Sequence, residues 1–550
     1  MERSQEVDST IADVAQEFRR DSESIRKKTM NEYDSLVGKA FKEFAGKVLD
    51  AASAMEPLHQ IRCLLEKDLI DKAQRFSRMR WLWYFRRAPL TSIFSGTLPS
   101  TFSYDTFLLE TLCGFAPNEQ RGLGDLLRYP INSNDIRRCL QLCHGIQYLS
   151  QIHVYLRFAG KGASIKFSNV GPVQSITDSA TREGIRLYDA RVANSGFQLT
   201  KLGSFVDAEY NKELTLVSYF RLDTPQFLPP LFSKDFSEVT VLSNCAPKVM
   251  SLSGFSQLAQ DPALASIEFL NKRTAALLLF LIALPEILVE LDAAPKTLMK
   301  NGYFLLSNES LESAMASTFQ KAAQTLNEIS GNIPVPNSAS EALTELRNIT
   351  PSLWPIDFPS PLIPIGNDAV CCDVVIASSA FLKLCEFPRL GGAAANARAN
   401  HFELATQEVI NKSAYKPSDE VLKLRGRSMT LKGKVITDID AIGAKDDTLL
   451  LVQCKSLVYS DEYDMGEKKA IINSWSTVEN GLVGWKKRIE EFEHNRVGDN
   501  YDFSAYKKFI SVLCTPQPIY VPAGQCTEEV APGLRATCTP QELSNFLSHA

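Results

Sequence analysis

The chain has 550 residues, of which 45% are hydrophobic and 22% are charged. This length predicts two or three domains, and the composition excludes a disordered or fibrous protein. The formal net charge of −5 excludes a protein that coats nucleic acid nonspecifically, because its bulk surface repels phosphate. Any contact with nucleic acid must therefore come from local basic patches.

Residues 1–150 are predicted to be mostly helical, because apolar residues recur there at helical spacing. Within them, residues 75–87 interleave five arginines with five aromatic residues. This segment could stack bases and bind phosphates, or press on a membrane surface. We favour buried aromatics with a solvated arginine face, because no motif accompanies the pattern.

Residues 151–328 are predicted to form a mixed α+β domain of unknown role. Several runs are strand-like and are separated by Gly, Asn, Asp and Pro. These runs are 153–158, 163–170, 185–192, 214–222 and 238–244. The most apolar run, 275–284, is too short to span a bilayer, so we expect a buried helix and no membrane contact.

Residues 329–366 contain seven prolines and are predicted to be a semi-rigid linker, interrupted by a short helix from Ser340 to Asn348. A domain boundary is expected here. The twelve cysteines lack the spacing of a zinc site. Reduced, buried thiols and a polar, acidic start to the chain together predict a cytoplasmic protein.

Residues 367–550 are predicted to form an α/β domain with a central mixed sheet. The expected order is a helix at 399–412, three strands, a long helix, a strand, and a terminal strand and helix. The last helix should begin at Thr539, since Thr-Pro-Gln-Glu is a good helix start.

Residues 434–457 are predicted to be a hairpin, with two aliphatic runs on either side of a polar break. Symmetric pairing about that break places Asp440 opposite Gln453. It also places Asp438 opposite Lys455, so four polar groups share one face. The other face carries apolar residues: Ile439, Ala441, Val452 and Cys454. Carboxylate and carbonyl oxygens are ligands for a hard divalent cation, which indicates a metal site.

The string Asp440-x12-Gln453-x-Lys455 resembles the PD-(D/E)xK motif of restriction-endonuclease-like nucleases, in a variant where Gln replaces the acidic residue. This variant is similar to that of Mrr-type restriction enzymes. The resemblance covers the last third of the chain. It implies a restriction-endonuclease-like fold there and a DNA endonuclease that depends on Mg²⁺ or Mn²⁺.

The resemblance also implies roles for individual residues. Asp440 would be the main metal ligand, assisted by the side-chain carbonyl of Gln453 and the backbone carbonyl of Cys454. Lys455 would position or activate the attacking water. Asp438 would tune Lys455 or hold a second ion.

The preceding helix should supply the ligand that completes the metal shell. The string Arg398-x3-Phe402-Glu403 resembles the corresponding family element, which favours Glu403, with Glu408 as the alternative. A solvated helix glutamate would explain Glu403 equally well. In the long helix, the cluster Lys486-Lys487-Arg488 could approach the phosphate backbone, although a mixed-charge solvated face is the simpler explanation.

The front 366 residues would then regulate or target the nuclease through an unknown protein partner or trigger, and defence against foreign DNA is one such setting by fold analogy. Cutting both strands of a duplex would favour a homodimer. Two alternatives stay open: cleavage of RNA, and a noncatalytic nucleic-acid-binding or assembly protein on a degenerate nuclease core.

Overall fold

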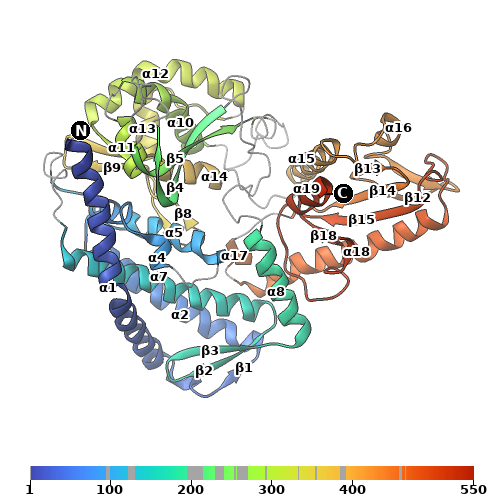
Figure 1. The fold of residues 1–550 in the computed structure, drawn as a ribbon, viewed down its shortest axis with the longest axis horizontal. Coiled ribbons are helices and arrows are strands. Elements are labelled where there is room, and N and C mark those ends of the chain that lie inside the picture. Colours follow the sequence, from blue (N-terminus) through green and yellow to red (C-terminus); the bar gives the residue numbers. More distant parts are fainter. Residues whose placement is uncertain are drawn as a thin grey trace.

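The structure is a computed structural model of the chain. It describes residues 2–94, 99–121, 131–194, 215–229, 241–252, 256, 260, 271–290, 294–331, 333–353, 356–384, 392–457, 461–464 and 466–549. The chain forms two units (Figure 1): a front unit that ends with residue 384 and a C-terminal unit that begins at residue 392. Both contain helices and sheets, so the fold is multidomain α/β.

The first half of the front unit is a helical assembly with one small sheet, ordered β1-β2-β3. Its elements are α1 (Glu2–Ala40), η1 (Lys42–Phe44), β1 (Val48–Leu49), α2 (Ala51–Ala73), α3 (Arg78–Phe85), α4 (Leu90–Ile93), α5 (Pro99–Gly114), α7 (Ser133–Gly160), β2 (Ser164–Ser168), β3 (Gly171–Ile176) and α8 (Ser179–Asn194). Helix α2 starts at Asp50, whose carboxylate accepts hydrogen bonds from two backbone N–H groups of the first turn. Its buried face, with Leu58, Leu65 and Leu69, packs against α7.

The arginine-rich and aromatic segment 75–87 belongs to this core. Trp81 and Tyr84 are at most 1% exposed, as the buried-aromatic interpretation predicted. The solvated arginine face was wrong for Arg86, which is also buried and pairs with Asp373 at 2.9 Å. All five aromatic side chains of the segment are buried, so none of them is available to stack on bases or to press on a membrane.

Two strand predictions fail in this region because helical packing prevails. Residues 153–158 continue α7, which therefore crosses the boundary expected at residue 150. Residues 185–192 lie in α8, where Ile185, Tyr188 and Val192 are buried one helical turn apart. Both runs are rich in β-branched and aromatic residues, which suit a strand as well as a buried helix face.

The second half of the front unit surrounds helix α10. Its elements are β4 (Thr215–Leu228), β5 (Val241–Ser251), α10 (Lys272–Glu290), α11 (Ala294–Asn301), β6 (Tyr303–Ser307), α12 (Asn308–Ile329), α13 (Ala339–Arg347), β7 (Ser352–Leu353), β8 (Ile356–Asp357), β9 (Leu362–Ile365), β10 (Ala369–Asp373) and α14 (Val374–Leu384). The apolar run 275–284 lies in α10 and is buried, apart from the partly buried Ile282, which confirms the predicted helix.

The proline-rich segment 329–366 is packed into the front unit and is not a linker. Its short helix is present as α13. Strand β9 pairs antiparallel with β10, which pairs antiparallel with β6, and Leu362 and Ile363 of β9 are fully buried. The predicted boundary at residue 367 therefore moves beyond α14. Prolines prevent regular helix but allow a short strand, and here the pairing comes from strands elsewhere in the chain.

The C-terminal unit has a four-stranded mixed sheet with the order β13-β14-β15-β18. Its elements are α15 (Gly392–Asn411), α16 (Asp419–Leu422), β11 (Ser428–Leu431), β12 (Lys434–Asp438), β13 (Ala441–Lys445), β14 (Thr448–Cys454), α17 (Asp461–Asp464), α18 (Lys468–His494), β15 (Lys508–Cys514), β16 (Glu529–Ala531), β17 (Leu534–Arg535), β18 (Thr537–Cys538) and α19 (Pro540–His549). β13 runs antiparallel to β14, while β14, β15 and β18 are parallel.

Helices cover both faces of this sheet (Figure 1). Residues of α15 and α19 pack on Val452 and Val512. On the other face, Trp485 and Phe492 of α18 pack on Leu451. Helix α19 begins as predicted, since Thr539 Oγ1 accepts a hydrogen bond from the Glu542 N–H at 3.3 Å.

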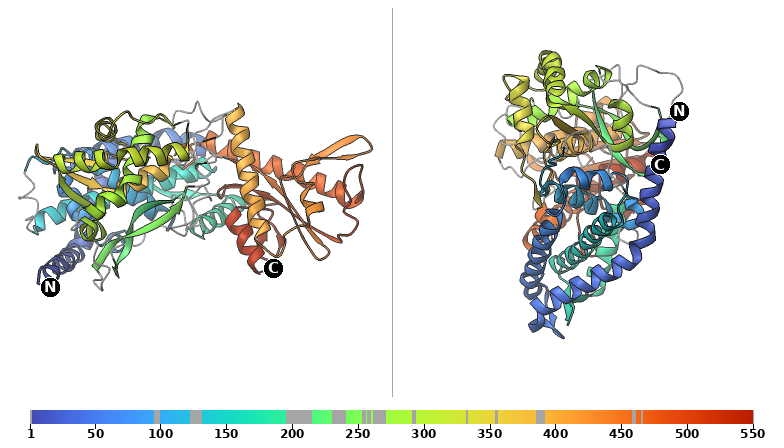
Figure 2. Two further views of the ribbon diagram at one scale, coloured as in Figure 1. Left: turned by 90° about the horizontal axis from the view of Figure 1, so that it is seen from above. Right: turned by 90° about the vertical axis from the view of Figure 1, so that its left-hand side faces the viewer.

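The two units meet where α7 and α8 contact α17, the start of α18 and the segment 515–523. Figure 2 shows the C-terminal unit extending from the front unit in the view from above, as in Figure 1. Tyr188 of α8 packs with Tyr463 and Tyr520 of the C-terminal unit. Arg191 and Glu542 form a bidentate ion pair, with N–O distances of 2.7 and 2.8 Å.

Candidate functional site

The hairpin β13–β14 has the predicted register. Ala441 pairs with Val452 and Lys445 with Thr448, so paired residue numbers follow the symmetric arrangement. The turn residue Asp446 has a φ of 51°, a left-handed conformation that Asp tolerates better than most residues. The register brings Asp440, which directly precedes β13, to the end of β14 that carries Gln453.

The predicted first strand of the hairpin is broken before Asp440, which corrects the position of Asp438. Strand β12 pairs with β11, and Asp438 is opposite Ser428 instead of Lys455. At the break, the Ile439 and Asp440 carbonyls accept hydrogen bonds from residues 425–426 instead of from a neighbouring strand, at 2.8 and 2.9 Å.

The break also changes which face of the sheet Ile439 occupies. Ile439 was expected beside Ala441, Val452 and Cys454. It packs on the α18 side, whereas those three residues pack on the α15 side.

Asp440 is 8% exposed and is held at the end of the sheet. Its Oδ2 accepts a hydrogen bond from the Cys454 N–H at 2.6 Å. Burial raises the pKa of Asp440, and the charge of Asp438 adds to the effect. Gln453, the neighbouring residue on β14, is also buried.

Glu403 is brought to Asp440 by the way α15 lies along β13. Gln407, one turn later in α15, bonds both backbone groups of Ile442 through its side-chain amide, at 2.8 and 2.9 Å. One helical turn and two strand residues span similar lengths, so Glu403 lies close to Asp440. Burial and the charge of Asp440 raise the pKa of Glu403 from 4.5 to about 7.

The alternative ligand, Glu408, does not reach this site. It is exposed and forms an ion pair with Lys412 at 3.3 Å. The two glutamates therefore have different surroundings on the same helix, and the bond between Gln407 and β13 determines which one faces the sheet.

Lys455 directly follows β14, and its N–H donates to the Cys514 carbonyl at 2.8 Å. Its aliphatic stem lies along α18 at Gly481, where an added Cβ would be 3.3 Å from Lys455 Cε. The positive charge of Lys455 is close enough to lower the pKa values of both Asp440 and Glu403, against the larger effect of burial.

Sequence reasoning missed two residues that position the site. Gln407 holds α15 against β13 by donating a hydrogen bond to the Ile442 carbonyl, and Arg425 donates through Nε to the Asp440 carbonyl. A polar residue one turn after Glu403 on an otherwise buried helix face was the available signal for Gln407. Arg398, noted only as part of the helix string, donates through Nε to Ser456 Oγ at 3.2 Å.

The basic cluster of α18 does not form one surface. Lys486 pairs with Glu528 at 3.4 Å, whereas Arg488 donates to Thr437 at 3.2 Å. Lys487 is exposed between them. The three side chains therefore diverge around the helix, as expected of a mixed-charge solvated face.

The donor set fits a hard divalent cation in its chemistry. Asp440 and Glu403 are oxygen donors whose negative charges oppose each other, and a cation between them would relieve that repulsion. Across the described ranges, no three His, Cys, Asp or Glu side chains are already arranged as a metal site. The backbone of Cys454 meets Asp440 through its N–H, and a role for its carbonyl stays a prediction.

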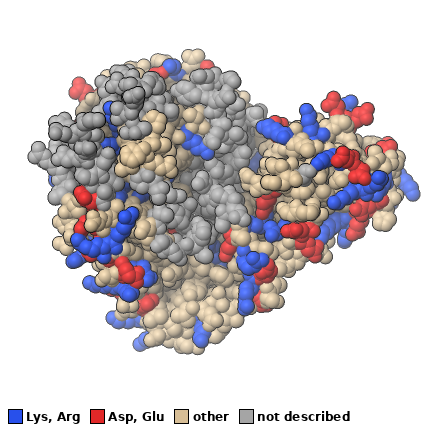
Figure 3. Space-filling model, viewed as in Figure 1, with Lys and Arg blue, Asp and Glu red and all other residues tan. Residues whose placement is uncertain are grey.

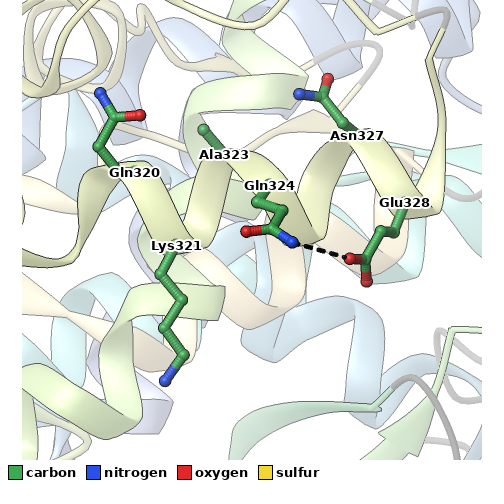
Figure 4. Close-up of a pocket in the computed structure, with 6 residues that line it drawn as sticks. All are labelled: Gln320, Lys321, Ala323, Gln324, Asn327 and Glu328. Atoms are coloured by element: carbon green, nitrogen blue, oxygen red, sulfur yellow. Dashed lines mark hydrogen bonds between the residues drawn. The ribbon is translucent and has the colours of Figure 1, made fainter.

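A surface depression lies elsewhere, on α12 of the front unit (Figure 4). One helix supplies its lining: Gln320, Lys321, Ala323, Gln324, Asn327 and Glu328. All of these residues except Ala323 are polar, and Gln324 donates to Glu328 at 3.4 Å. It is not connected with the carboxylate site on the C-terminal sheet.

Comparisons with protein-family models, curated proteins and solved structures found no match to this chain. In the part of the chain that the structure describes, no helix is long and apolar enough to cross a membrane.

Proposed function

We propose that the C-terminal unit is a restriction-endonuclease-like domain that hydrolyses phosphodiester bonds in DNA with Mg²⁺ or Mn²⁺, and that the front unit regulates or targets it. One arrangement carries the proposal: the β13–β14 register places Asp440 at the end of β14, and Gln407, one helical turn after Glu403, bonds Ile442, two residues after Asp440. Two carboxylates from distant segments of the chain are thereby brought together. They lie beside Lys455 at one end of a mixed sheet. Carboxylates with raised pKa values beside a lysine are common at functional sites.

Glu403 and Asp440 would hold the cation, with Gln453 and the Cys454 carbonyl as neutral oxygen ligands. A bound Mg²⁺ or Mn²⁺ supplies Lewis-acid polarisation of the phosphate and a more acidic water. Because Oδ2 of Asp440 accepts from the Cys454 N–H, that carboxylate keeps a fixed orientation and presents Oδ1.

Lys455 would orient the attacking water and offset the negative charge that develops on the phosphate oxygens. Its backbone is fixed to β15 and its stem to α18, so the ammonium group has a restricted position. Asp438 is exposed at the end of β12, where it would attract a second cation.

The first prediction tests Lys455. Purified protein is incubated with supercoiled plasmid in Mg²⁺, Mn²⁺ or EDTA, beside Lys455→Ala. We expect metal-dependent nicking or linearisation, reduced about 10²–10³-fold or more in the variant, because the charge on phosphorus loses a preorganised partner. Lys508→Ala is the matched control, since Lys508 is exposed at the opposite end of the same sheet. Cleavage by Lys455→Ala at the wild-type rate would contradict the mechanism.

One feature favours a noncatalytic function instead. Gln453 stands where most members of the resembled superfamily have an acid, which removes one negative charge from the cation site. A nucleic-acid-binding or assembly protein on such a core should hold nucleic acid equally well in EDTA and after Asp440→Asn. Substituting labelled RNA for plasmid in the same assay tests the alternative of an RNA-cleaving enzyme.

A further inference from the structure

A short hairpin, β11 and β12, has its base next to the candidate site, since β12 ends two residues before Asp440. Strands β11 and β12 are joined by the two-residue turn Lys432-Gly433, in which both residues have positive φ, 53° and 76°. Two positive φ angles are typical of the tight turns that match strand twist. The hairpin forms its own two-stranded sheet, separate from the four-stranded sheet.

The hairpin tip is held in place by the segment that follows α18. The carboxylate of Asp499 accepts hydrogen bonds from the N–H groups of Lys432 and Gly433, at 3.0 and 2.8 Å. Asn500 accepts from the Thr430 N–H and donates to the Ser428 carbonyl, both at 2.9 Å. A surface fixed in this way loses little conformational entropy when a ligand binds.

The base of the hairpin is attached to the site itself. Asp438 ends β12 two residues before Asp440, and residues 425–426 bond the carbonyls of Ile439 and Asp440. The five residues of β12, at about 3.4 Å each, separate the tip from Asp438 by roughly 17 Å. Along B-form DNA that distance corresponds to about five base pairs.

The charge of this segment is opposite to that of the whole chain. Residues 421–437 contain five basic and no acidic residues, whereas the chain has a net charge of −5. Four of the five are exposed, and none of the four forms an ion pair within the described ranges: Lys423, Arg427, Lys432 and Lys434. Figure 3 shows basic side chains, with acidic ones among them, at the outer end of the C-terminal unit.

We propose that the β11–β12 hairpin binds the phosphate backbone of duplex DNA, with Lys432 and Lys434 as its principal contacts. The proposal rests on the proposed function, since the duplex is the nuclease's substrate. The B-form major groove admits a two-stranded β-ribbon, whereas the major groove of duplex RNA is too narrow. Residues 421–437 contain no aromatic residue on which the bases of a single strand could stack.

The test compares Lys432→Ala/Lys434→Ala with Lys507→Ala/Lys508→Ala in the full chain. Lys507 and Lys508 are exposed lysines at the start of β15, so they are a charge-matched control. Binding of a labelled 24-base-pair duplex is measured by anisotropy in EDTA at several KCl concentrations. Loss of two phosphate contacts should reduce the slope of log K against log salt by about 1.8, with roughly tenfold or more weaker binding at low salt.

The outcomes separate the two proposals. Weaker binding and a smaller slope in the hairpin variant alone support the hairpin contact, even if the wild-type protein cuts no plasmid and the nuclease proposal fails. Wild-type cleavage with unchanged slope in the hairpin variant overturns the hairpin contact and leaves the nuclease. If the hairpin variant loses as much affinity for single-stranded DNA or duplex RNA as for duplex DNA, duplex DNA is the wrong ligand. The same conclusion follows if the wild-type protein binds no duplex DNA.

Discussion

Glu403 and Asp440 oppose each other electrostatically unless a cation or a proton lies between them. Asp440 is stabilised in its charged form by the Cys454 N–H, while Glu403 has its pKa raised to about 7. A proton on Glu403 therefore relieves the repulsion in the absence of metal. At the residue scale, a proton and the proposed cation would compete for the same carboxylate.

The pH dependence of stability in EDTA follows from this. The folded pKa of Glu403 is about 7 and the unfolded value is 4.5, so the folded state binds more protons between these pH values. Stability from this group is complete below pH 4.5 and is lost as the pH rises through 7. Glu403→Gln removes the loss, so the variant should gain thermal stability relative to wild type as the pH rises from 4.5 to 7.

Glu408→Gln is the matched control for this experiment, because Glu408 is an exposed glutamate of the same helix. The difference in thermal stability between Glu408→Gln and the wild type should not change with pH in the way expected for Glu403→Gln. Excess Mg²⁺ should reduce the advantage of Glu403→Gln at pH 7, since the cation favours the charged carboxylate. A stability difference for Glu403→Gln that is constant from pH 4.5 to 7.5 would refute the assigned pKa.

At the scale of elements, the edge of the four-stranded sheet is protected by side-chain and loop contacts. Strand β13 lies at the edge of the sheet. The backbone N–H and C=O groups of its Ile442 are hydrogen-bonded to the side chain of Gln407, and the Ala444 N–H donates to the Tyr415 carbonyl at 2.9 Å. An edge strand with free N–H and C=O groups would offer a template for pairing with another chain. The same bonds that cover the edge also align α15 with the site.

Gly481 of helix α18 has no side chain, which leaves room for the side chain of Lys455 beside the helix. An added Cβ at Gly481 would be 2.9 Å from Leu513 Cδ1 and 3.3 Å from Lys455 Cε, so Gly481→Ala must displace Leu513 and push Lys455 slightly from its position. If Lys455 acts as proposed, plasmid cleavage should fall by about ten- to a hundredfold, because small misplacements of a catalytic group are costly. The measurement is the initial rate of nicking under saturating Mg²⁺, with folding checked by circular dichroism.

Gly484 of the same helix supplies the control. A Cβ there meets nothing within 4 Å. Gly484→Ala should therefore raise the unfolding free energy by about 0.5–1 kcal/mol through helix propensity and leave cleavage unchanged. Equal cleavage rates in the two alanine variants would show that Gly481 does not position Lys455.

For the whole molecule, the joint between the units depends on a close backbone approach. An added Cβ at Gly160 of α7 would be 2.2 Å from the Gly466 carbonyl oxygen, and one at Gly466 would be 2.4 Å from the Leu156 carbonyl carbon. The ion pair between Arg191 and Glu542 and the tyrosine cluster surround this point. Because Gly466 lies between α17 and α18, it connects the segment after Lys455 to the front unit.

Gly466→Ala should open this joint. Gly466 has a φ of 81°, so alanine costs about 1–2 kcal/mol in backbone strain in addition to the clash. We expect faster hydrogen exchange in α7, α8 and α17 and a larger radius of gyration by small-angle scattering. Gly533→Ala is the control, because Gly533 has a φ of 76° with nothing within 4 Å of its Cβ position. If both variants behave alike, strain alone explains the effect and the joint is not tight.

The sequence alone determined those features whose contacts lie within a few residues of each other along the chain. Alternation and the polar break predicted the register of β13 and β14, Thr539 predicted the start of α19, and the apolar run 275–284 predicted a buried helix. Each of these depends on contacts within one turn or one hairpin, so the necessary information lies within a few residues.

Only the tertiary structure decided features that depend on distant partners. The proline-rich segment became part of the front core because β9 finds β10, which in turn finds β6. The strand break before Asp440 is accompanied by a hydrogen bond from Arg425, and the choice of Glu403 over Glu408 depends on the bond between Gln407 and Ile442. The spacing of apolar residues along the sequence does not predict such bonds, since the same helix or strand pattern allows several partners.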